Sequence, residues 1–218
     1  MIHVEHAHLR ATLQSGVEEL SLNLSSDQID NMIAYLILLS KWNSVYNLTS
    51  IRDPKEMVKQ HLLDSLSAAP AFKDAKNVLD VGAGGGLPGM MLAITYPDIK
   101  ISMIDTVSKK TAFLTQAKTE LGLKNVTVHT GRVEALQVKD KFDVITSRAF
   151  SELCNFINWS GHLLAEGGQF IAMKGVAPNQ EIERLPDGWQ VEKMQALAVP
   201  GLQAERHLVF IKKQLAPA

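Results

Sequence analysis

Short apolar runs alternate with amphipathic segments from residue 77 onward. Gly122 after Leu121 is a typical helix stop. This alternation predicts a parallel β-sheet with helices on both faces. The predicted strands are 77–81, 100–105, 125–129, 142–147 and 168–174, and the helices between them are 88–95, 108–121 and 152–164.

The two ends of the chain follow other patterns. Residues 1–60 show helical periodicity, with a capping-box pair at Ser25 and Gln28 before an apolar face. We interpret them as an N-terminal helical extension packed on a main domain, residues 61–218. Near the C-terminus, Trp189–Val199 and His207–Lys212 flank Pro200-Gly201 and predict a final antiparallel hairpin.

Composition narrows the class of protein. The 218 residues are 46% hydrophobic, enough for one large core with an appended segment. The net charge of −1 gives no whole-chain sign of a polyanionic partner, although residues 100–150 hold nine Lys or Arg against five Asp or Glu. The single Cys154 excludes an internal disulfide and is interpreted as helix packing. With no signal-peptide pattern and no run of 18 apolar residues, we expect a cytoplasmic monomer without membrane contact.

The richest chemistry lies in the segment Val78–Gly89, which joins a buried strand to a helix through a glycine loop. Gly82, Gly84 and Gly86 permit a tight turn and close approach of backbone N–H groups to a ligand. A dinucleotide fingerprint requires its third glycine where Leu87 stands. The spacing therefore favours S-adenosylmethionine over NAD, with Asp80 as one carboxylate for it; a plain strand-to-helix turn is the alternative.

A second acid supports this interpretation. Asp105 ends the next predicted strand, 23 positions after Gly82, close to where an acid for ribose hydroxyls belongs. The carboxyl ends of adjacent parallel strands meet at one edge, so Asp105 and Asp80 are both predicted at the carboxyl edge of the sheet, where doubly wound sheets bind ligands. The alternative is that Asp105 caps the helix that begins near Ser108.

Several segments together resemble one known family. They are Trp42-Asn43, Tyr46–Thr49, His61–Ser65, Asp80–Gly89, Ser147–Ala149, Lys174-Gly175 and Glu205–Leu208. The combination is similar to the glucose-inhibited division protein B family, bacterial methyltransferases that act on guanine N7 in 16S ribosomal RNA. The resemblance spans about residues 25–213. Gln60 departs from it, because a basic residue is expected before His61, and one phosphate contact is thereby in doubt.

The resemblance implies a class I S-adenosylmethionine methyltransferase fold, Rossmann-like, with a seven-stranded, mostly parallel sheet plus the helical extension. It implies that Gly82 and Leu87 line the cofactor pocket, that Asp105 holds the ribose and that Val133-Glu134 meet the adenine. For Glu134 the alternative is an ordinary acid at a helix start. Arg148 is expected beside the emerging methyl group, as both cofactor ligand and catalytic residue. No metal is implied.

The implied reaction needs little acid or base chemistry. Guanine N7 has a free lone pair and no proton, so alignment with the methyl group matters most. The absence of a catalytic triad agrees with this, and Cys154 is predicted far from the strand ends.

For the RNA partner, candidate contacts are Arg148, Lys174, Arg206 and His207, all predicted at strand ends. Solvated strand termini are the alternative for Arg206 and His207. The near-neutral charge favours a partner of preformed shape, such as the assembled small ribosomal subunit.

Three other functions remain open from the sequence. A methyltransferase acting on a small molecule or protein shares the loop and Asp105 but has no need of the flanking cations. A NAD-binding oxidoreductase is disfavoured by Leu87. A non-catalytic module that retains the fold predicts no tight cofactor binding.

Overall fold

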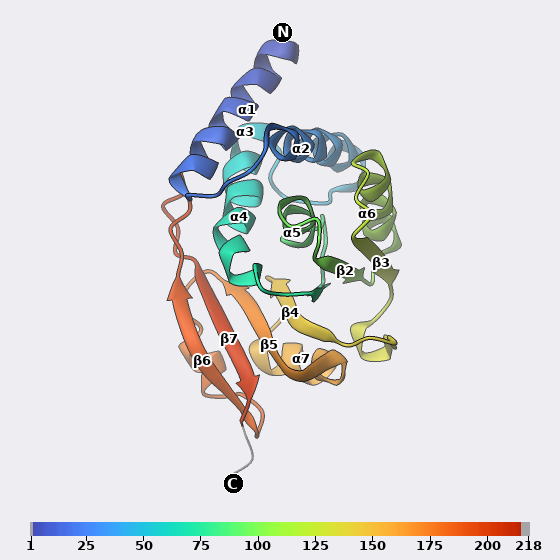
Figure 1. Ribbon diagram of the computed structural model, residues 1–218, viewed down its shortest axis with the longest axis vertical. Helices are drawn as coiled ribbons and strands as arrows, with labels where there is room; N and C mark the ends of the chain where they lie inside the picture. The colour runs from blue at the N-terminus through green and yellow to red at the C-terminus, as the bar shows by residue number, and fades with distance from the viewer. Residues whose placement is uncertain (1, 215–218) are drawn as a thin grey trace.

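The computed structural model describes residues 2–214 and contains one seven-stranded sheet (Figure 1). The strand order is β3-β2-β1-β4-β5-β7-β6. All pairings from β3 to β5 are parallel, whereas β7 is antiparallel to both β5 and β6. The strands are β1 (Asn77–Val81), β2 (Lys100–Asp105), β3 (Val126–Thr130), β4 (Phe142–Arg148), β5 (Leu164–Lys174), β6 (Trp189–Ala196) and β7 (His207–Lys213). The parallel sheet and the antiparallel C-terminal hairpin are confirmed.

Helices cover both faces of this sheet. The helices α5 (Gly89–Thr95) and α6 (Ser108–Glu120) pack on one face, and α7 (Leu153–Ser160) packs on the other (Figure 1). The N-terminal helix α2 (Ser26–Tyr46) lies outside α5 and α6 and contacts both. The remaining helices are α1 (Ile2–Glu19), α3 (Pro54–Met57), η1 (Val58–Leu63), α4 (Asp64–Ala68), η2 (Ala69–Phe72), η3 (Val133–Ala135), η4 (Gly161–Leu163) and α8 (Asn179–Ile182).

The N-terminal helices share one apolar core with the sheet. The predicted capping box is present, because Gln28 N–H donates to Ser25 Oγ and the Gln28 side chain accepts from Ser25 N–H. The Gln28 amide also donates to the carbonyls of Ile94 and Thr95, and so ties α2 to the last turn of α5. The helical segment from Pro54 to Phe72 runs without a break through residue 60. A division into domains at that residue stays a prediction.

Three local predictions were wrong in detail. Strand β5 begins at Leu164 rather than 168, so α7 ends at Ser160. The reason is an irregular pairing: Phe142 opposes Leu164 and Val144 opposes Gln169, which leaves an excursion between them that includes Gly167 at φ +73°. The connection between β6 and β7 is a ten-residue loop with a Val199–Leu202 bridge, longer than a turn, and α8 was not predicted.

None of the helices in residues 2–214 is long and apolar enough to cross a membrane.

Candidate functional site

The glycine loop after β1 turns the chain sharply back into α5. Gly82, Gly84 and Gly86 have φ values of +67°, +57° and +90°, conformations that L side chains rarely adopt. A Cβ at Gly86 would lie 2.6 Å from Leu114, so that glycine serves helix packing. At Gly82 a Cβ would overlap the ring of Phe150. The three glycines thus share a backbone requirement but face different surroundings.

A cavity of about 620 Å³ opens at the carboxyl ends of β1, β2 and β4. This volume lies in the range of small-molecule sites, and the switch point of a doubly wound sheet is where such sites form. The predicted residues Gly82, Asp105, Val133 and Glu134 line it. Its other lining residues are Val81, Ile104, Thr106, Val107, Lys110, Gly131, Arg132, Ala149, Phe150 and Trp159.

Asp105 braces this cavity. Its side chain is 7% exposed, and its Oδ2 accepts from Gly84 N–H at 3.0 Å while its Oδ1 accepts from Val107 N–H at 2.9 Å. Lys110 Nζ lies 4.0 Å away. Because a carboxylate oxygen accepts more than one hydrogen bond, capacity remains for two hydroxyl groups of a ligand. The bond to Val107 beside the start of α6 also agrees in part with the alternative of a helix-start role.

Asp80, Leu87, Gly84 and Gly86 do not line the cavity. Asp80 is fully buried behind the loop, where its Oδ2 accepts from Gly89 N–H at 2.9 Å and its Oδ1 has no partner among the described residues. Burial raises the pKa of Asp80 to about 7. Leu87 is part of the apolar core. Asp80 and Leu87 thus support the loop from its buried side, and Gly84 and Gly86 are part of the loop itself.

Two aromatic rings, Phe150 and Trp159, form an aromatic wall of the same cavity. Phe150 and Trp159 meet edge to face with ring centroids 5.8 Å apart, and Phe150 follows Ala149 at φ +54°. Sequence reasoning missed both rings, together with Lys110 and Arg132. The sequence offers one signal for Phe150, an aromatic residue close after a predicted strand end. The local sequence does not determine the direction in which such a ring points.

Arg148 at the end of β4 points away from the first cavity and into a second one of about 370 Å³. Ala149 lines both cavities, so they adjoin at that residue. The predicted residues Arg148, Lys174, Arg206 and His207 all line the second cavity. The sequence interpretation therefore placed these four side chains together, although Arg148 is not on the wall of the first cavity.

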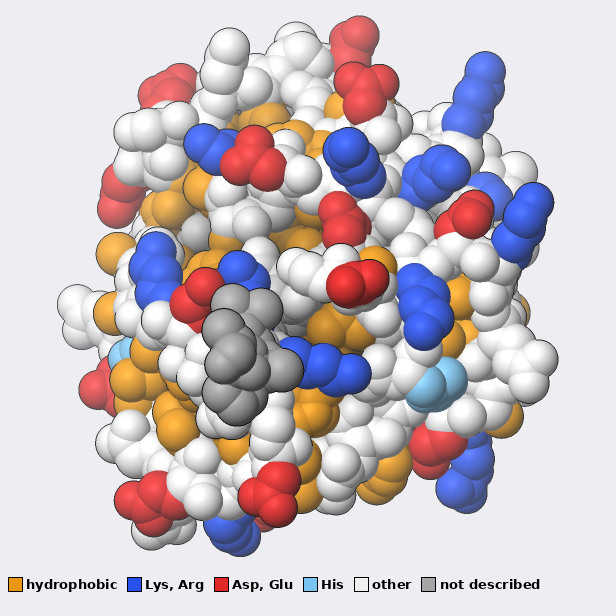
Figure 2. Space-filling model, turned by 60° about the horizontal axis from the view of Figure 1, so that its bottom comes forward, with side chains coloured by type: hydrophobic (Ala, Val, Ile, Leu, Met, Phe, Trp, Pro, Cys, Tyr) orange, Lys and Arg blue, Asp and Glu red, His pale blue; other side chains and the backbone are white. Residues whose placement is uncertain are grey.

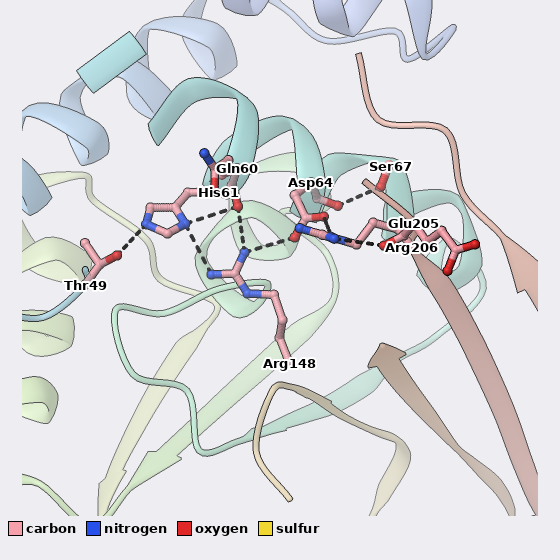
Figure 3. Close-up of polar contacts among 8 residues, drawn as sticks. All are labelled: Thr49, Gln60, His61, Asp64, Ser67, Arg148, Glu205 and Arg206. Carbon is pink, nitrogen blue, oxygen red and sulfur yellow. Dashed lines mark hydrogen bonds and ion pairs between the residues drawn. The ribbon is translucent and has the colours of Figure 1, made fainter. Parts of the chain in front are cut away.

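Residues 60–64, at the end of η1 and the start of α4, hold Arg148 in place through polar contacts (Figure 3). Arg148 Nη1 donates to Gln60 O and to Asp64 Oδ2, each at 3.1 Å, and Nη2 lies 3.4 Å from His61 Nδ1. The segment η1 is a π-helix, a wider turn that is frequent at functional sites. Burial, with the nearby Arg148 charge, lowers the pKa of His61 to about 4, so His61 is neutral near pH 7.

Asp64 binds a second guanidinium through its other oxygen. Arg206 Nε donates to Asp64 Oδ1 at 2.6 Å, and the Asp64 side chain is only 3% exposed (Figure 3). Arg206 is therefore held rather than free at a strand terminus. His207 Nδ1 lies 2.7 Å from Gly175 O, and Lys174 Nζ pairs with Glu181 Oε2 at 2.8 Å. Sequence reasoning assigned no role to Asp64, although it stands in the segment His61–Ser65.

Charge is mixed over the face of the molecule in Figure 2, where Lys and Arg side chains are interspersed with Asp and Glu. Among residues whose side chains are described, no group of three His, Cys, Asp or Glu is placed to hold a metal.

Solved structures with similar folds include proteins that are named as methyltransferases. TrmN from Thermus thermophilus shares 17% identity, covers 72% of this chain and 53% of its own, and has a TM-score of 0.53. The glycopeptide N-methyltransferase MtfA, in complex with S-adenosylmethionine, shares 13% identity over 71% of this chain and 95% of its own, with a TM-score of 0.59. At these identities the likeness shows the fold, which is that of class I S-adenosylmethionine methyltransferases.

Sequence relatives are much closer. The protein named ribosomal RNA small subunit methyltransferase G from Janthinobacterium sp. (strain Marseille) is 65% identical over 94% of this chain and 95% of its own. A protein of the same name from Neisseria meningitidis serogroup C (strain 053442) is 52% identical over 93% and 97%. The family model described as GidB, rRNA small subunit methyltransferase G, matches residues 28–209. This chain therefore belongs to the GidB family of rRNA small subunit methyltransferases.

Proposed function

We propose that this chain transfers the methyl group of S-adenosylmethionine to N7 of a guanine in the 16S ribosomal RNA of the small subunit. The observation that carries the proposal is the meeting of two cavities at Ala149, one with an acid over a glycine loop and one rich in cations. Such a pair suits a cofactor on one side and a nucleotide base on the other, with the transferred group between them.

The first cavity fits the cofactor on its own chemistry. Gly82 lines the cavity beside Phe150, where there is no space for a Cβ, and Asp105 retains acceptor capacity for the ribose hydroxyls. Val133 and the exposed Glu134 would hold the adenine, because the Glu134 carboxylate is an acceptor that suits an exocyclic amine. When bound, S-adenosylmethionine supplies an electrophilic methyl group.

The second cavity holds the target base. The N7 lone pair attacks the methyl carbon as the carbon–sulfur bond breaks, and N7 carries no proton that a base would have to remove. Alignment in a site shielded from water can contribute up to about 7–11 kcal/mol in well-oriented systems. Arg148, fixed by Gln60 and Asp64 at the border of the two cavities, is the group that aligns the base.

In this proposal, the cationic side chains that line the second cavity bind the RNA. Lys174, Arg206 and His207 line the base site and supply positive or hydrogen-bonding groups for the phosphates of an unstacked strand. The mixed charge in Figure 2 and the net charge of −1 favour a partner of defined shape, so we infer that the substrate is RNA within the small subunit. A monomer in the cytoplasm completes the proposal.

The test is mass mapping of 7-methylguanine in 16S ribosomal RNA from cells with and without this protein. We expect one modified guanine to be lost on deletion, to return with the wild-type chain and to stay absent with Arg148→Ala. Unchanged methylation in the deletion strain would contradict the proposal. Purified protein that methylates a small molecule or a protein, and leaves small subunits unmodified, would favour the alternative substrate classes.

A further inference from the structure

The second cavity is lined by hydrogen-bond donors. Four of its lining residues carry side-chain nitrogens, namely Arg148, Lys174, Arg206 and His207, and Asp64 is the one carboxylate among the described residues that line it. Both oxygens of Asp64 are already bound by guanidinium groups, at 3.1 Å and 2.6 Å. The cavity therefore offers a base many donors and few charged acceptors.

Arg148 retains donors for a ligand. A guanidinium has five N–H groups. Contacts with described residues engage Nη1 twice, at Gln60 O and Asp64, and Nη2 once, at His61, which leaves Nε–H and one Nη2–H. Because His61 is neutral near pH 7, it orients Arg148 without repelling it.

Guanine and adenine differ at the position next to N7. Guanine carries the O6 acceptor there, whereas adenine carries the N6 amine, a donor. With N7 turned toward the first cavity, that neighbouring position faces the border of the two cavities, where Arg148 ends β4. A guanidinium donor there satisfies O6 and opposes an amine.

We propose that Arg148 selects guanine by donating to O6, and that Asp64 is the positioning residue that holds Arg148 and Arg206 in place. This inference rests on the proposed function and adds the atom that is recognised. It also implies that the N2 amine of guanine is not read in this cavity. Both oxygens of Asp64 are bound by guanidinium groups, and the Gln60 side-chain amide donates to Glu56 Oε2 at 2.9 Å.

Base analogues test the proposal with the wild-type protein. Small subunits are assembled with 16S RNA in which the mapped target guanine is kept, replaced by inosine, which lacks the N2 amine, or replaced by 2,6-diaminopurine, which lacks O6. Single-turnover methylation is measured for each, and the rates are normalised to reaction of the same N7 with dimethyl sulfate. Inosine should react within about threefold of guanine, and 2,6-diaminopurine should lose about tenfold to a hundredfold, as expected for one charge-assisted hydrogen bond.

The outcomes separate this inference from the proposed function. Equal rates for 2,6-diaminopurine and guanine, or a tenfold loss for inosine, would overturn recognition through O6. Failure of the unmodified guanine to react would contradict the proposed function instead.

The role of Asp64 is tested by Asp64→Asn. Its preference for inosine over 2,6-diaminopurine should shrink at least about threefold, while S-adenosylmethionine affinity stays at the wild-type value. Glu192→Gln is the matched control, because Glu192 pairs with Lys212 on the distant hairpin and its loss should leave the preference unchanged. If thermal melting shows that Asp64→Asn is unfolded, Asp64→Glu, which keeps the charge but moves it by one methylene, takes its place. An unchanged preference in the folded variant would overturn the positioning role.

Discussion

Asp80→Asn should stabilise the protein more at high pH than at low pH. Asp80 is fully buried behind the glycine loop, with one oxygen bound to Gly89 N–H and the other without a partner among the described residues. Burial raises its pKa from 3.8 to about 7. An acid with a raised pKa in the folded state contributes stability below its unfolded pKa and loses it as pH rises through the folded pKa.

The expected size follows from those two pKa values. Between pH 5 and pH 8 the penalty for ionising Asp80 in the folded protein grows by up to about 3 kcal/mol. Asparagine has nearly the same shape, keeps an acceptor for Gly89 and does not ionise. The asparagine amide lowers the free energy of unfolding by a constant amount at every pH. The informative quantity is therefore how the difference in free energy of unfolding between Asp80→Asn and wild type changes with pH.

Urea unfolding at pH 5, 6, 7 and 8 measures this quantity. The lowered pKa of His61 makes the wild-type protein lose stability as pH falls from 6.5 toward 4, but this contribution is common to both proteins and cancels in the difference. Asp98→Asn, at an exposed position, is the control and should show no such trend. A difference between Asp80→Asn and wild type that is constant from pH 5 to pH 8 would refute the reasoning.

Three further predictions concern ligand binding. Gly82→Val should abolish S-adenosylmethionine binding in calorimetry while circular dichroism retains the sheet, because the new side chain overlaps Phe150 at φ +67°; wild-type affinity would place the pocket elsewhere. Asp105→Ala should weaken the cofactor by about 1–3 kcal/mol and also lower the melting temperature, since Gly84 and Val107 lose an acceptor; a lower melting temperature with intact affinity would leave only the bracing role. Lys174→Ala or Arg206→Ala should weaken binding to small subunits and leave cofactor affinity unchanged. In filter binding at several salt concentrations, the slope of log affinity against log salt concentration should fall by about one for each lost phosphate contact. An unchanged slope would place the RNA-binding surface elsewhere on the protein.

The sequence by itself determined the features that depend on local patterning. The glycine spacing at 82, 84 and 86 predicted a loop that requires positive φ, and all three glycines have it. Asp105 was predicted at a strand end beside that loop because parallel strands bring their carboxyl ends to one edge. The capping box at Ser25 and the C-terminal hairpin followed equally from neighbouring residues.

The tertiary structure alone decided which polar groups meet. Asp64 binds Arg148 across 84 positions and Arg206 across 142, and no local pattern encodes such pairs. Asp80 is the last residue but one of β1 and Asp105 is the last residue of β2, so both stand near strand ends, yet Asp80 is buried behind the loop and Asp105 lines the cavity. The direction of a side chain at a strand end depends on what the fold packs against it. The loop and the sheet edge could therefore be predicted from the sequence. The pairing of Arg148 and Arg206 with Asp64, and the aromatic wall, could be identified only in the tertiary structure.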